Sequence, residues 1–539
     1  MTSAQQSFVL DELLPAAIHW IEQALSVVPV SGPLRFVRGC ASFWSTTPEI
    51  CYQASSAVCG TDASGAYYTL PDSLLDSQRV CASCFGDGCS GASSACNTSS
   101  AGGGVVGDFV LMVSSVQTAS CTGSTLAYAS TCQRDQLDRP ILGDVNFCPS
   151  RVSTDAAQMA EQKATAVHEL LHALGFTSSS WSLFRYEDGT PRTARDANGR
   201  VPTSTSYQCP DGTVGDIRVP ANNTITVGSE RGVTVTRLVT PKVHSVVQDI
   251  FGCDTLEGAE LENQPTTSGS CYGSHWEQRL MMNELMASTT SHVAIYSALT
   301  LAALEDSGWY RSNYSMAEPL IWGRLQGCSF VTGKCVEDGM PLPTPNPTFC
   351  NVSNKLGCTA DHKARGRCNL AQYSSSLPAE YQHFADPALG GALAQADYCP
   401  YFVGATDGDC DTVTNAPTQN YKAETFGSGS SCTESTLSQP IHSFVLNDAS
   451  GPACHVTRCF GDALLQLQIA AADGSTHWLN CTEGGQYVTP PVLLGISGTI
   501  QCPAELWYLC DAGRCPSRCA DPWHKGSHCQ GGVCTCGGV

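Results

Sequence analysis

The sequence predicts an α+β fold, in which a mixed sheet lies beside long helices and a disulfide-rich, mostly β and irregular C-terminal domain follows. Two observations carry this prediction. The N-terminal half alternates segments rich in β-branched and aromatic residues with amphipathic, helix-like segments. From Cys328 to Cys510 cysteines recur often and helical periodicity fades, which is typical of a domain held by disulfides.

The first predicted element is an amphipathic helix from Leu14 to Val28, entered at Pro15. A short strand is expected at Leu34–Val37. The stretch from Cys81 to Gly104 is rich in Cys, Gly and Ser, so we expect a surface loop that its own bridges hold.

Two strands are expected next because both segments are rich in β-branched and aromatic residues: Asp108–Ser114 and Ile141–Cys148. Ser153 or Thr154 can then cap a helix that runs to Leu174, where Gly175 supplies the C-terminal stop. Residues 177–240 are polar and rich in turn signals.

The chain has 539 residues, a formal net charge of −21 and 31 cysteines. The acidic balance argues against non-specific nucleic-acid binding, and no apolar run approaches the roughly 20 residues that span a bilayer. So many cysteines indicate an extracellular or lumenal chain, and the expected location is extracellular or on the cell surface. Five glycosylation sequons fit a secretory route: Asn97, Asn222, Asn313, Asn351 and Asn480.

Both ends are expected to be incomplete. Residues 1–30 show no signal-peptide pattern, and Cys519–Cys536 resembles part of a small cysteine-rich module. The odd cysteine count fits a lost partner. Membrane attachment is therefore left open to segments beyond these ends.

The most informative motif is His168-Glu-Leu-Leu-His172, late in the second predicted helix. Histidines at i and i+4 lie on one helix face, so both imidazoles can reach one metal ion. The glutamate between them, Glu169, can then face a water on the metal and act as general base. The alternative is a pair of partly buried structural histidines, which rarely follow a cap signal or precede a glycine such as Gly175.

Gly175 narrows the class of metal site. In metzincins the motif continues H-E-x-x-H-x-x-G-x-x-H, and the glycine lets the chain turn toward a third histidine. Here Ser178 stands at that third position. The site therefore has another third ligand, or the chain belongs to another zinc class that uses a downstream glutamate. Glu187 is the nearest such glutamate, but the turn signal Asp188-Gly189 places it poorly.

Further stretches resemble the leishmanolysin-type surface zinc metallopeptidases, metzincins in which an insertion separates the glycine from the third histidine. The shared stretches are His168–Phe176, Gly252–Glu257, Gly273–Arg279, Asn283–Ala287, Leu299–Ala302, Asp306–Tyr310 and Trp322-Gly323 before Cys328. The resemblance covers nearly all of residues 8–512. It implies a metzincin-type catalytic domain with one catalytic Zn²⁺.

By this resemblance the metal ligands are His168, His172 and His275, Glu169 is the catalytic base, and Met286 is the Met-turn methionine. The competitors for the third ligand are His244 and His292, each within about fifty residues of His275. His275 is preferred because it follows a Gly-Ser pair suited to a turn and stands eleven residues before Met286.

The resemblance also implies eight disulfides: Cys59–Cys132, Cys253–Cys328, Cys335–Cys399, Cys350–Cys368, Cys358–Cys432, Cys410–Cys454, Cys459–Cys510 and Cys481–Cys502. Cys209 and Cys271 are expected to staple the insertion. Cys81 and Cys84 form a C-x-x-C pair, for which structural bridging is favoured over zinc or redox chemistry in such a chain.

The expected organisation has four parts. They are an N-terminal catalytic subdomain with the zinc-binding helix (1–182), an insertion and central catalytic subdomain with the third ligand and Met-turn (183–326), a disulfide-rich domain (327–512) and a truncated cysteine-rich, EGF-like module (513–539). The expected function is zinc-dependent endopeptidase action on protein or peptide substrates by a monomer, in extracellular or cell-surface proteolysis and cell adhesion. The resemblance places Ile141–Cys148 as the edge strand for an extended substrate. The alternative is a catalytically silent adhesion or binding protein on the same scaffold.

Overall fold

The computed structural model describes most of the chain. The described ranges are 1–46, 49–62, 64–123, 125–155, 158–264, 271–289, 294–342, 348–441, 450–460, 464–504, residue 506, and the backbone of 527–530 and 533–536. Helices and strands are both abundant, so the predicted α+β fold is confirmed. Most of the cysteine-rich module expected at 513–539 lies outside the described residues.

The chain begins with one continuous helical segment made of α1 (Ser3–Ser7), the π-helical turn η1 (Phe8–Leu13) and α2 (Leu14–Ala24). The helix therefore starts earlier than Pro15 predicts and stops before Val28. It starts early because Thr2 and Gln5 form a capping box. It stops at Ala24 because Leu25 turns to extended backbone and begins β1 (Leu25–Ser26), which pairs with β16 (Arg311–Ser312).

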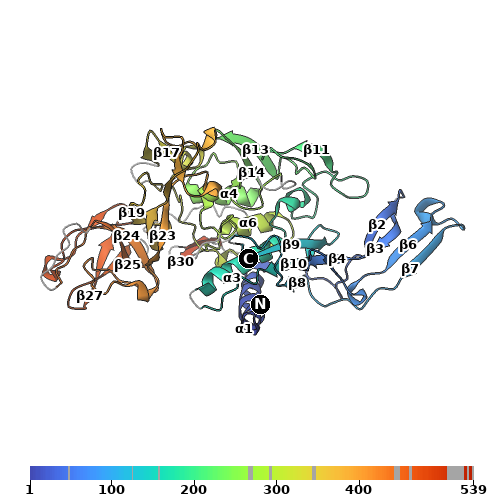
Figure 1. The fold of residues 1–539 in the computed structure, drawn as a ribbon, viewed down its shortest axis with the longest axis horizontal. Coiled ribbons are helices and arrows are strands. Elements are labelled where there is room, and N and C mark those ends of the chain that lie inside the picture. The colour runs from blue at the N-terminus through green and yellow to red at the C-terminus, as the bar shows by residue number, and fades with distance from the viewer. Residues whose placement is uncertain are drawn as a thin grey trace.

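A four-stranded sheet occupies the region of the loop expected at Cys81–Gly104. Its order is β2 (Gly39–Trp44), β3 (Ile50–Ser55), β6 (Gln78–Ser83) and β7 (Ala95–Ser99). The prediction of a loop is wrong, because Cys81 and Cys96 face each other across the β6–β7 ladder. The prediction that the stretch is held by its own bridges is confirmed by Cys81–Cys96 and Cys84–Cys89. The strand expected at Leu34–Val37 is replaced by isolated bridges at Leu34 and Phe36. The sheet projects from one end of the molecule, with β4 (Val58–Thr61), paired with β5 (Tyr67–Thr69), at its base (Figure 1).

The mixed sheet at the centre has the order β8 (Val110–Ser114), β10 (Pro140–Phe147), β9 (Ala127–Arg134). β10 runs parallel to β8 and antiparallel to β9. The expectation that Ile141–Cys148 is an edge strand is therefore wrong. All eight residues of β10 are buried, as in a strand that is covered on both faces. Among the described residues, β9 is the free edge on this side of the sheet.

The second long helix, α3 (Met159–Ala173), packs against β9 and β10. It begins later than a Ser153 or Thr154 cap predicts. Ser153 is bonded instead through its backbone, since the Gln162 side chain accepts from its N–H and donates to its C=O. The predicted stop is confirmed, because Gly175 has a φ of 110°.

Hairpins and short helices make up the central region. They are β11 (Ser204–Gln208), β12 (Val214–Ile217), β13 (Ile225–Glu230), β14 (Val233–Leu238), α4 (Pro241–Phe251), β15 (Ala259–Leu261), α5 (Gln278–Met281) and α6 (Ala298–Asp306). The disulfide Cys209–Cys271 joins the first hairpin to the segment that follows β15. The expected staple of the insertion is thus confirmed.

The C-terminal region begins at α7 (Cys328–Thr332) and is mainly β. Its largest sheet has six strands in the order β27 (Thr476–Cys481), β26 (Leu465–Ala470), β25 (Gly451–Cys459), β24 (Ser430–Ser435), β29 (Ile500–Gln501) and β28 (Tyr487–Val488). Strands β24, β25 and β27 lie at the left of the view in Figure 1, and helices α4 and α6 lie near its middle.

Seven of the eight expected disulfides are confirmed. For the eighth, Cys459 is disulfide-bonded and its expected partner Cys510 lies outside the described residues. Sequence reasoning did not place four others: Cys40–Cys51, Cys81–Cys96, Cys84–Cys89 and Cys121–Cys148. The C-x-x-C pair is therefore structural, as predicted.

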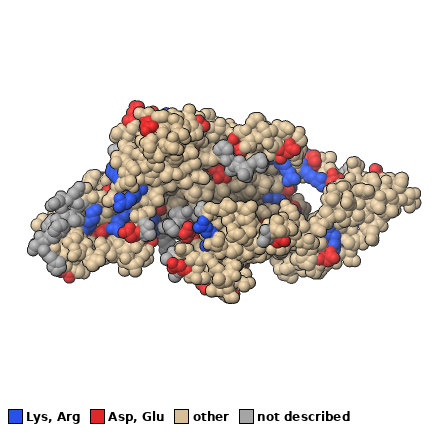
Figure 2. Space-filling view, in the orientation of Figure 1, with Lys and Arg blue, Asp and Glu red and all other residues tan. Residues whose placement is uncertain are grey.

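On the face seen in Figure 2, acidic and basic side chains of the described residues are scattered among uncharged ones. No helix within the described ranges combines the length and apolar composition needed to cross a membrane.

The disulfide Cys209–Cys271 separates its cysteines by 62 residues, and Cys84–Cys89 by 5. In the chain-entropy model the longer loop stabilises the fold by about 4 kcal/mol and the shorter by about 2 kcal/mol. We therefore expect the double variant Cys209→Ser, Cys271→Ser to lower the free energy of unfolding in urea more than the control pair Cys84→Ser, Cys89→Ser. An equal or smaller loss for the long loop would contradict this expectation.

Candidate metal centre and active site

Two histidines of α3 lie one helical turn apart on the same face. The Nε2 atoms of His168 and His172 are 3.0 Å apart. The i, i+4 spacing produces this proximity, since side chains four residues apart stack along a helix. His168 is buried, and the following residue, Glu169, is only 8% exposed.

The third histidine comes from a distant part of the chain. His275 Nε2 lies 3.1 Å from His172 Nε2, although 103 residues separate them. The segment that carries His275 runs beside β15, because Glu262 N–H donates to His275 O at 2.9 Å. On its other side Trp276 N–H donates to Met286 O at 2.9 Å. The structure thus brings together all three histidines that the sequence singled out, and with them it forms a group that could hold a metal ion.

Each clustered histidine uses its Nδ1 in a hydrogen bond away from the cluster. His168 Nδ1 lies 2.7 Å from Leu285 O, and His172 Nδ1 lies 2.6 Å from Phe176 O. His275 Nδ1 lies 2.9 Å from Glu262 Oε1. Because these partners are acceptors, each Nδ1 carries the proton and each Nε2 presents a lone pair to the centre of the cluster.

Two of the three histidines, His168 and His172, are held in the uncharged state that a metal ligand requires. Burial, followed by the charge of His275, lowers the pKa of His168 to about 3. Burial, followed by the charge of His168, lowers the pKa of His172 well below its usual range. Nitrogens bound tetrahedrally to zinc at about 2.05 Å lie roughly 3.3 Å apart. The observed separations of 3.0 and 3.1 Å fit such an ion.

Glu169 connects the helix to the sheet edge. Its carboxylate accepts a hydrogen bond from the backbone N–H of Ala129, in β9. Burial raises the pKa of Glu169 to about 8, and the Ala129 hydrogen bond offsets part of that rise. In the metal-free site this carboxyl therefore holds a proton near neutral pH.

The turn that contains Met286 contacts His168 through the carbonyl of Leu285. Met286 is fully buried, and its N–H donates to the Glu284 carboxylate at 2.5 Å. Glu284 also accepts at 2.6 Å from both Ser297 Oγ and Thr300 Oγ1. Leu285 between them supplies the carbonyl that orients His168, so the turn and the histidine are fixed together.

Glu284 and Ser178 help to build this site, and sequence reasoning missed the role of each. Glu284 stands within the shared stretch Asn283–Ala287, but nothing in its spacing marked it as the support of the turn. Ser178 stands where a contiguous motif has its third histidine, and its N–H donates at 3.0 Å to Oγ of Ser274, the residue before His275. Ser178 thus helps to hold the segment that carries His275, the third histidine of this cluster.

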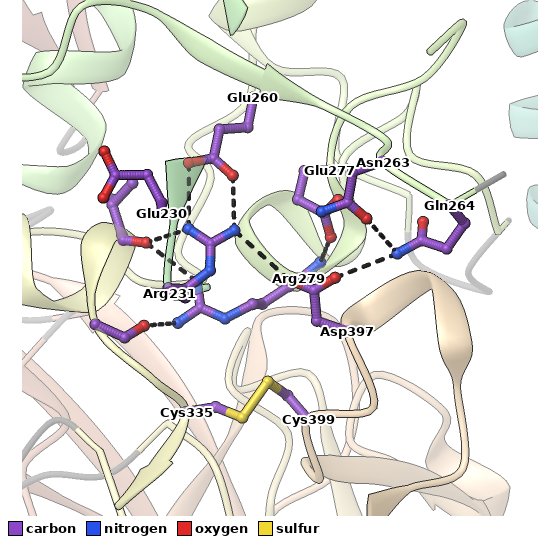
Figure 3. A network of polar contacts seen from close by, with 12 residues as sticks. Glu230, Arg231, Glu260, Asn263, Gln264, Glu277, Arg279, Cys335, Asp397 and Cys399 are labelled. Carbon is purple, nitrogen blue, oxygen red and sulfur yellow. Dashed lines mark hydrogen bonds and ion pairs between the residues drawn. A yellow bond between two sulfur atoms is a disulfide. The ribbon is translucent and has the colours of Figure 1, made fainter. Parts of the chain in front are cut away.

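A buried charge network ties the His275 segment to the C-terminal region (Figure 3). Arg231 lies 2.8 Å from Glu260, in β15, and 3.5 Å from Asp397. The Arg279 guanidinium, in α5, donates to main-chain carbonyls of α7 and the residue after it. The disulfide Cys335–Cys399 lies beside the network. Buried ions at these distances satisfy one another, and removal of one leaves an uncompensated charge.

Two of the competing ligands, Glu187 and His244, are not in the cluster. Glu187 has a side chain that is 86% exposed and pairs with Arg311. His244, in α4, is hydrogen-bonded to Gln248. His292 lies outside the described residues. Two other groups of possible ligands in the described part of the chain each contain a disulfide, Cys335–Cys399 or Cys59–Cys132, which leaves no thiolate for a metal.

Three convergent imidazoles, a neighbouring buried carboxyl and an H-E-x-x-H helix against a mixed sheet define a class of protein, the metal-dependent peptidases.

Comparison with known sequences gives the family. A profile described as Leishmanolysin, peptidase family M8, matches residues 81–513, and the chain belongs to this family. A leishmanolysin-like peptidase of Drosophila melanogaster is 32% identical over 540 residues, covering 92% of this chain and 76% of that protein. One of Caenorhabditis elegans is 34% identical over 478 residues (80% and 69%). Leishmanolysin of Leishmania donovani is 30% identical over 418 residues (74% and 62%).

The raised pKa of Glu169 predicts a pH-dependent stability difference in the zinc-free protein. Between pH 4.5, the ordinary value, and about 8, the folded state keeps a proton that the unfolded chain releases. The free energy of unfolding therefore falls as pH rises through this window. Glu169→Gln has no such proton, so its advantage in stability over wild type should grow from pH 5 to pH 8, reaching on the order of 1–3 kcal/mol.

Thermal unfolding of chelator-treated protein at several pH values measures this difference. The exposed Glu187→Gln serves as the control and should show no pH-dependent gain. A difference between Glu169→Gln and wild type that stays constant or shrinks as pH rises would refute the assignment.

Proposed function

We propose that this protein is a zinc endopeptidase of the metzincin type, with His168, His172 and His275 as metal ligands and Glu169 as general base. The observation that carries the proposal is the convergence of three imidazoles, each with its Nδ1 bonded to an acceptor outside the cluster and its Nε2 directed inward. Three neutral nitrogen ligands with one position left open are the usual donor set of catalytic zinc.

When bound, zinc supplies Lewis-acid chemistry that polarises the scissile carbonyl and lowers the pKa of a water molecule toward about 7. The chain's own contribution is proton transfer and positioning. Glu169 accepts the proton of the attacking water and returns it to the leaving amine. Its hydrogen bond to Ala129 fixes the carboxylate beside the sheet edge where the substrate would lie.

An extended peptide would bind along β9 rather than β10, since β9 is an outer strand of the described sheet and β10 lies between two others. Such a substrate adds a strand to the sheet, and main-chain hydrogen bonds hold it irrespective of its sequence. The position of Ala129 in β9 beside Glu169 supports this placement. The side-chain preference would come from pockets that flank the strand.

The working environment is the secretory route, at the cell surface or outside the cell. The many disulfides fit an oxidising compartment. Four of the five sequon asparagines are exposed and open to glycosylation: Asn97, Asn222, Asn313 and Asn480. We further propose that the protein acts as a monomer in cell-surface proteolysis and adhesion, with domain limits near residues 182, 326 and 512.

A catalytically silent adhesion protein is the second candidate. The buried Glu169 argues against it, because a binding scaffold gains nothing from a carboxyl whose burial destabilises the fold near neutral pH. Digestion of casein or gelatin with and without a zinc chelator distinguishes the two candidates. Chelator-sensitive cleavage is expected of the peptidase, and absence of cleavage by zinc-replete protein is expected of the silent scaffold.

Glu169→Gln should keep zinc content near that of wild type and reduce peptidase activity by at least about 10²-fold. The amide preserves the shape of the side chain but cannot accept the proton. Metal analysis and peptide hydrolysis on the same sample measure both quantities. Wild-type turnover by a metal-replete Glu169→Gln sample would overturn the role of this residue.

His275→Ala should lose zinc on dialysis and become inactive, since two protein ligands are too few for a tight catalytic site. His244→Ala is the matched control, because His244 contacts Gln248 and lies outside the cluster. It should keep metal and activity. Zinc retained by His275→Ala but lost by His244→Ala would show that the third ligand has been misassigned.

A further inference from the structure

The three clustered histidines differ in what holds their Nδ1 atoms. Those of His168 and His172 are bonded to main-chain carbonyls, at 2.7 and 2.6 Å. That of His275 is bonded to a carboxylate, Glu262 Oε1, at 2.9 Å. Of these three Nδ1 bonds, the one of His275 alone is made to a side chain. Mutation of Glu262 can therefore remove this bond, whereas a main-chain carbonyl cannot be removed by mutation.

We propose that Glu262 is a positioning residue for the metal centre: it fixes the tautomer and the ring orientation of His275 and so determines how tightly the ion is held. The proposal rests on the zinc site proposed above. Glu262 directs its carboxylate at Nδ1, which leaves the proton there and turns the Nε2 lone pair toward His168 and His172.

The main chain fixes Glu262 and His275 to each other. Glu262 directly follows β15, whose last residue, Leu261, forms a β-bridge with Trp276. Glu262 N–H donates to His275 O at 2.9 Å, and Ser274 N–H donates to Glu262 Oε1 at 3.0 Å. The carboxylate is therefore held in place by the same segment that carries the ligand.

Gly273 makes this approach sterically feasible. A Cβ on Gly273 would lie 2.6 Å from Glu262 Cγ and 2.7 Å from Glu262 O, so a larger residue would displace the glutamate. The backbone of Gly273 is not in the left-handed region. The Gly-Ser pair before His275 is thus required for the close approach of Glu262, rather than for the turn that the sequence suggested.

His275 needs this support more than the other two histidines do. His168 and His172 are fixed by α3, and His168 is 5% exposed. His275 is on an irregular segment, and its side chain is 23% exposed, so packing constrains its ring less. Carboxylate partners of this kind raise the basicity of a histidine ligand, and their loss typically weakens metal binding 10- to 100-fold.

The test is zinc affinity, measured by competition with a fluorescent chelator on the full chain and without reference to activity. Glu262→Ala should weaken zinc binding about 10- to 100-fold. Glu262→Gln should weaken it about tenfold or less, because the amide oxygen can still accept from Nδ1 but carries no charge. Glu257→Gln, an exposed glutamate five residues earlier, removes the same charge and should bind zinc within about twofold of wild type.

A second measurement separates positioning from a merely structural role. The visible spectrum of the Co²⁺-loaded protein reports ligand geometry, so it should change in Glu262→Ala and Glu262→Gln and match wild type in Glu257→Gln. If Glu262→Ala does not fold, the Gln variant carries the comparison.

Wild-type affinity in both Glu262 variants would overturn the inference, as would an equal loss in Glu257→Gln. Failure of the wild-type protein to bind one zinc ion would instead overturn the proposed function, so the two failures are distinguishable.

Discussion

The constraint on which the rest of this structure depends is a cluster of three imidazoles, in which His172 Nε2 lies 3.0 Å from His168 Nε2 and 3.1 Å from His275 Nε2. Lone pairs at that distance repel unless a cation lies between them, and burial opposes the uptake of protons by His168 and His172 that would relieve the repulsion. The arrangement therefore persists only because the surrounding chain holds each ring from behind. Two rings are held by main-chain carbonyls and the third by Glu262.

The His275 ring is the most difficult to position, because it lies 103 residues beyond His172 in the sequence. β15 pairs with one side of the His275 segment, and the segment around Met286 is bonded to its other side. The disulfide Cys209–Cys271 restrains the chain four residues before His275. The buried pair of Arg231 and Glu260 then anchors β15 itself (Figure 3). The long insertion is thus compatible with a precise site because several independent restraints converge on its far end.

What the sequence predicted was mainly local. The H-E-x-x-H pair and the stop at Gly175 follow from helix periodicity and glycine conformation, and seven disulfides followed from the family resemblance. The resemblance also supplied one non-local feature of the site, His275, but it misplaced the edge strand. The segment around Ile141 has the composition of any buried strand, so composition cannot tell a central strand from an edge. Glu262 gave no signal either, because its function arises only where β15 meets the His275 segment.

The strand at the sheet edge also contacts Glu169, the carboxyl proposed as general base. Ala129 in β9 gives its N–H to Glu169, so a peptide pairing with β9 must use the other main-chain groups of that strand. Pairing beside this point would bring the peptide backbone next to the carboxylate without requiring any particular side chain. The burial that raises the pKa of Glu169 destabilises the folded state as that group ionises. The same burial keeps water away from the carboxyl. The loss of folding stability near neutral pH is therefore compatible with a role of this carboxyl in proton transfer.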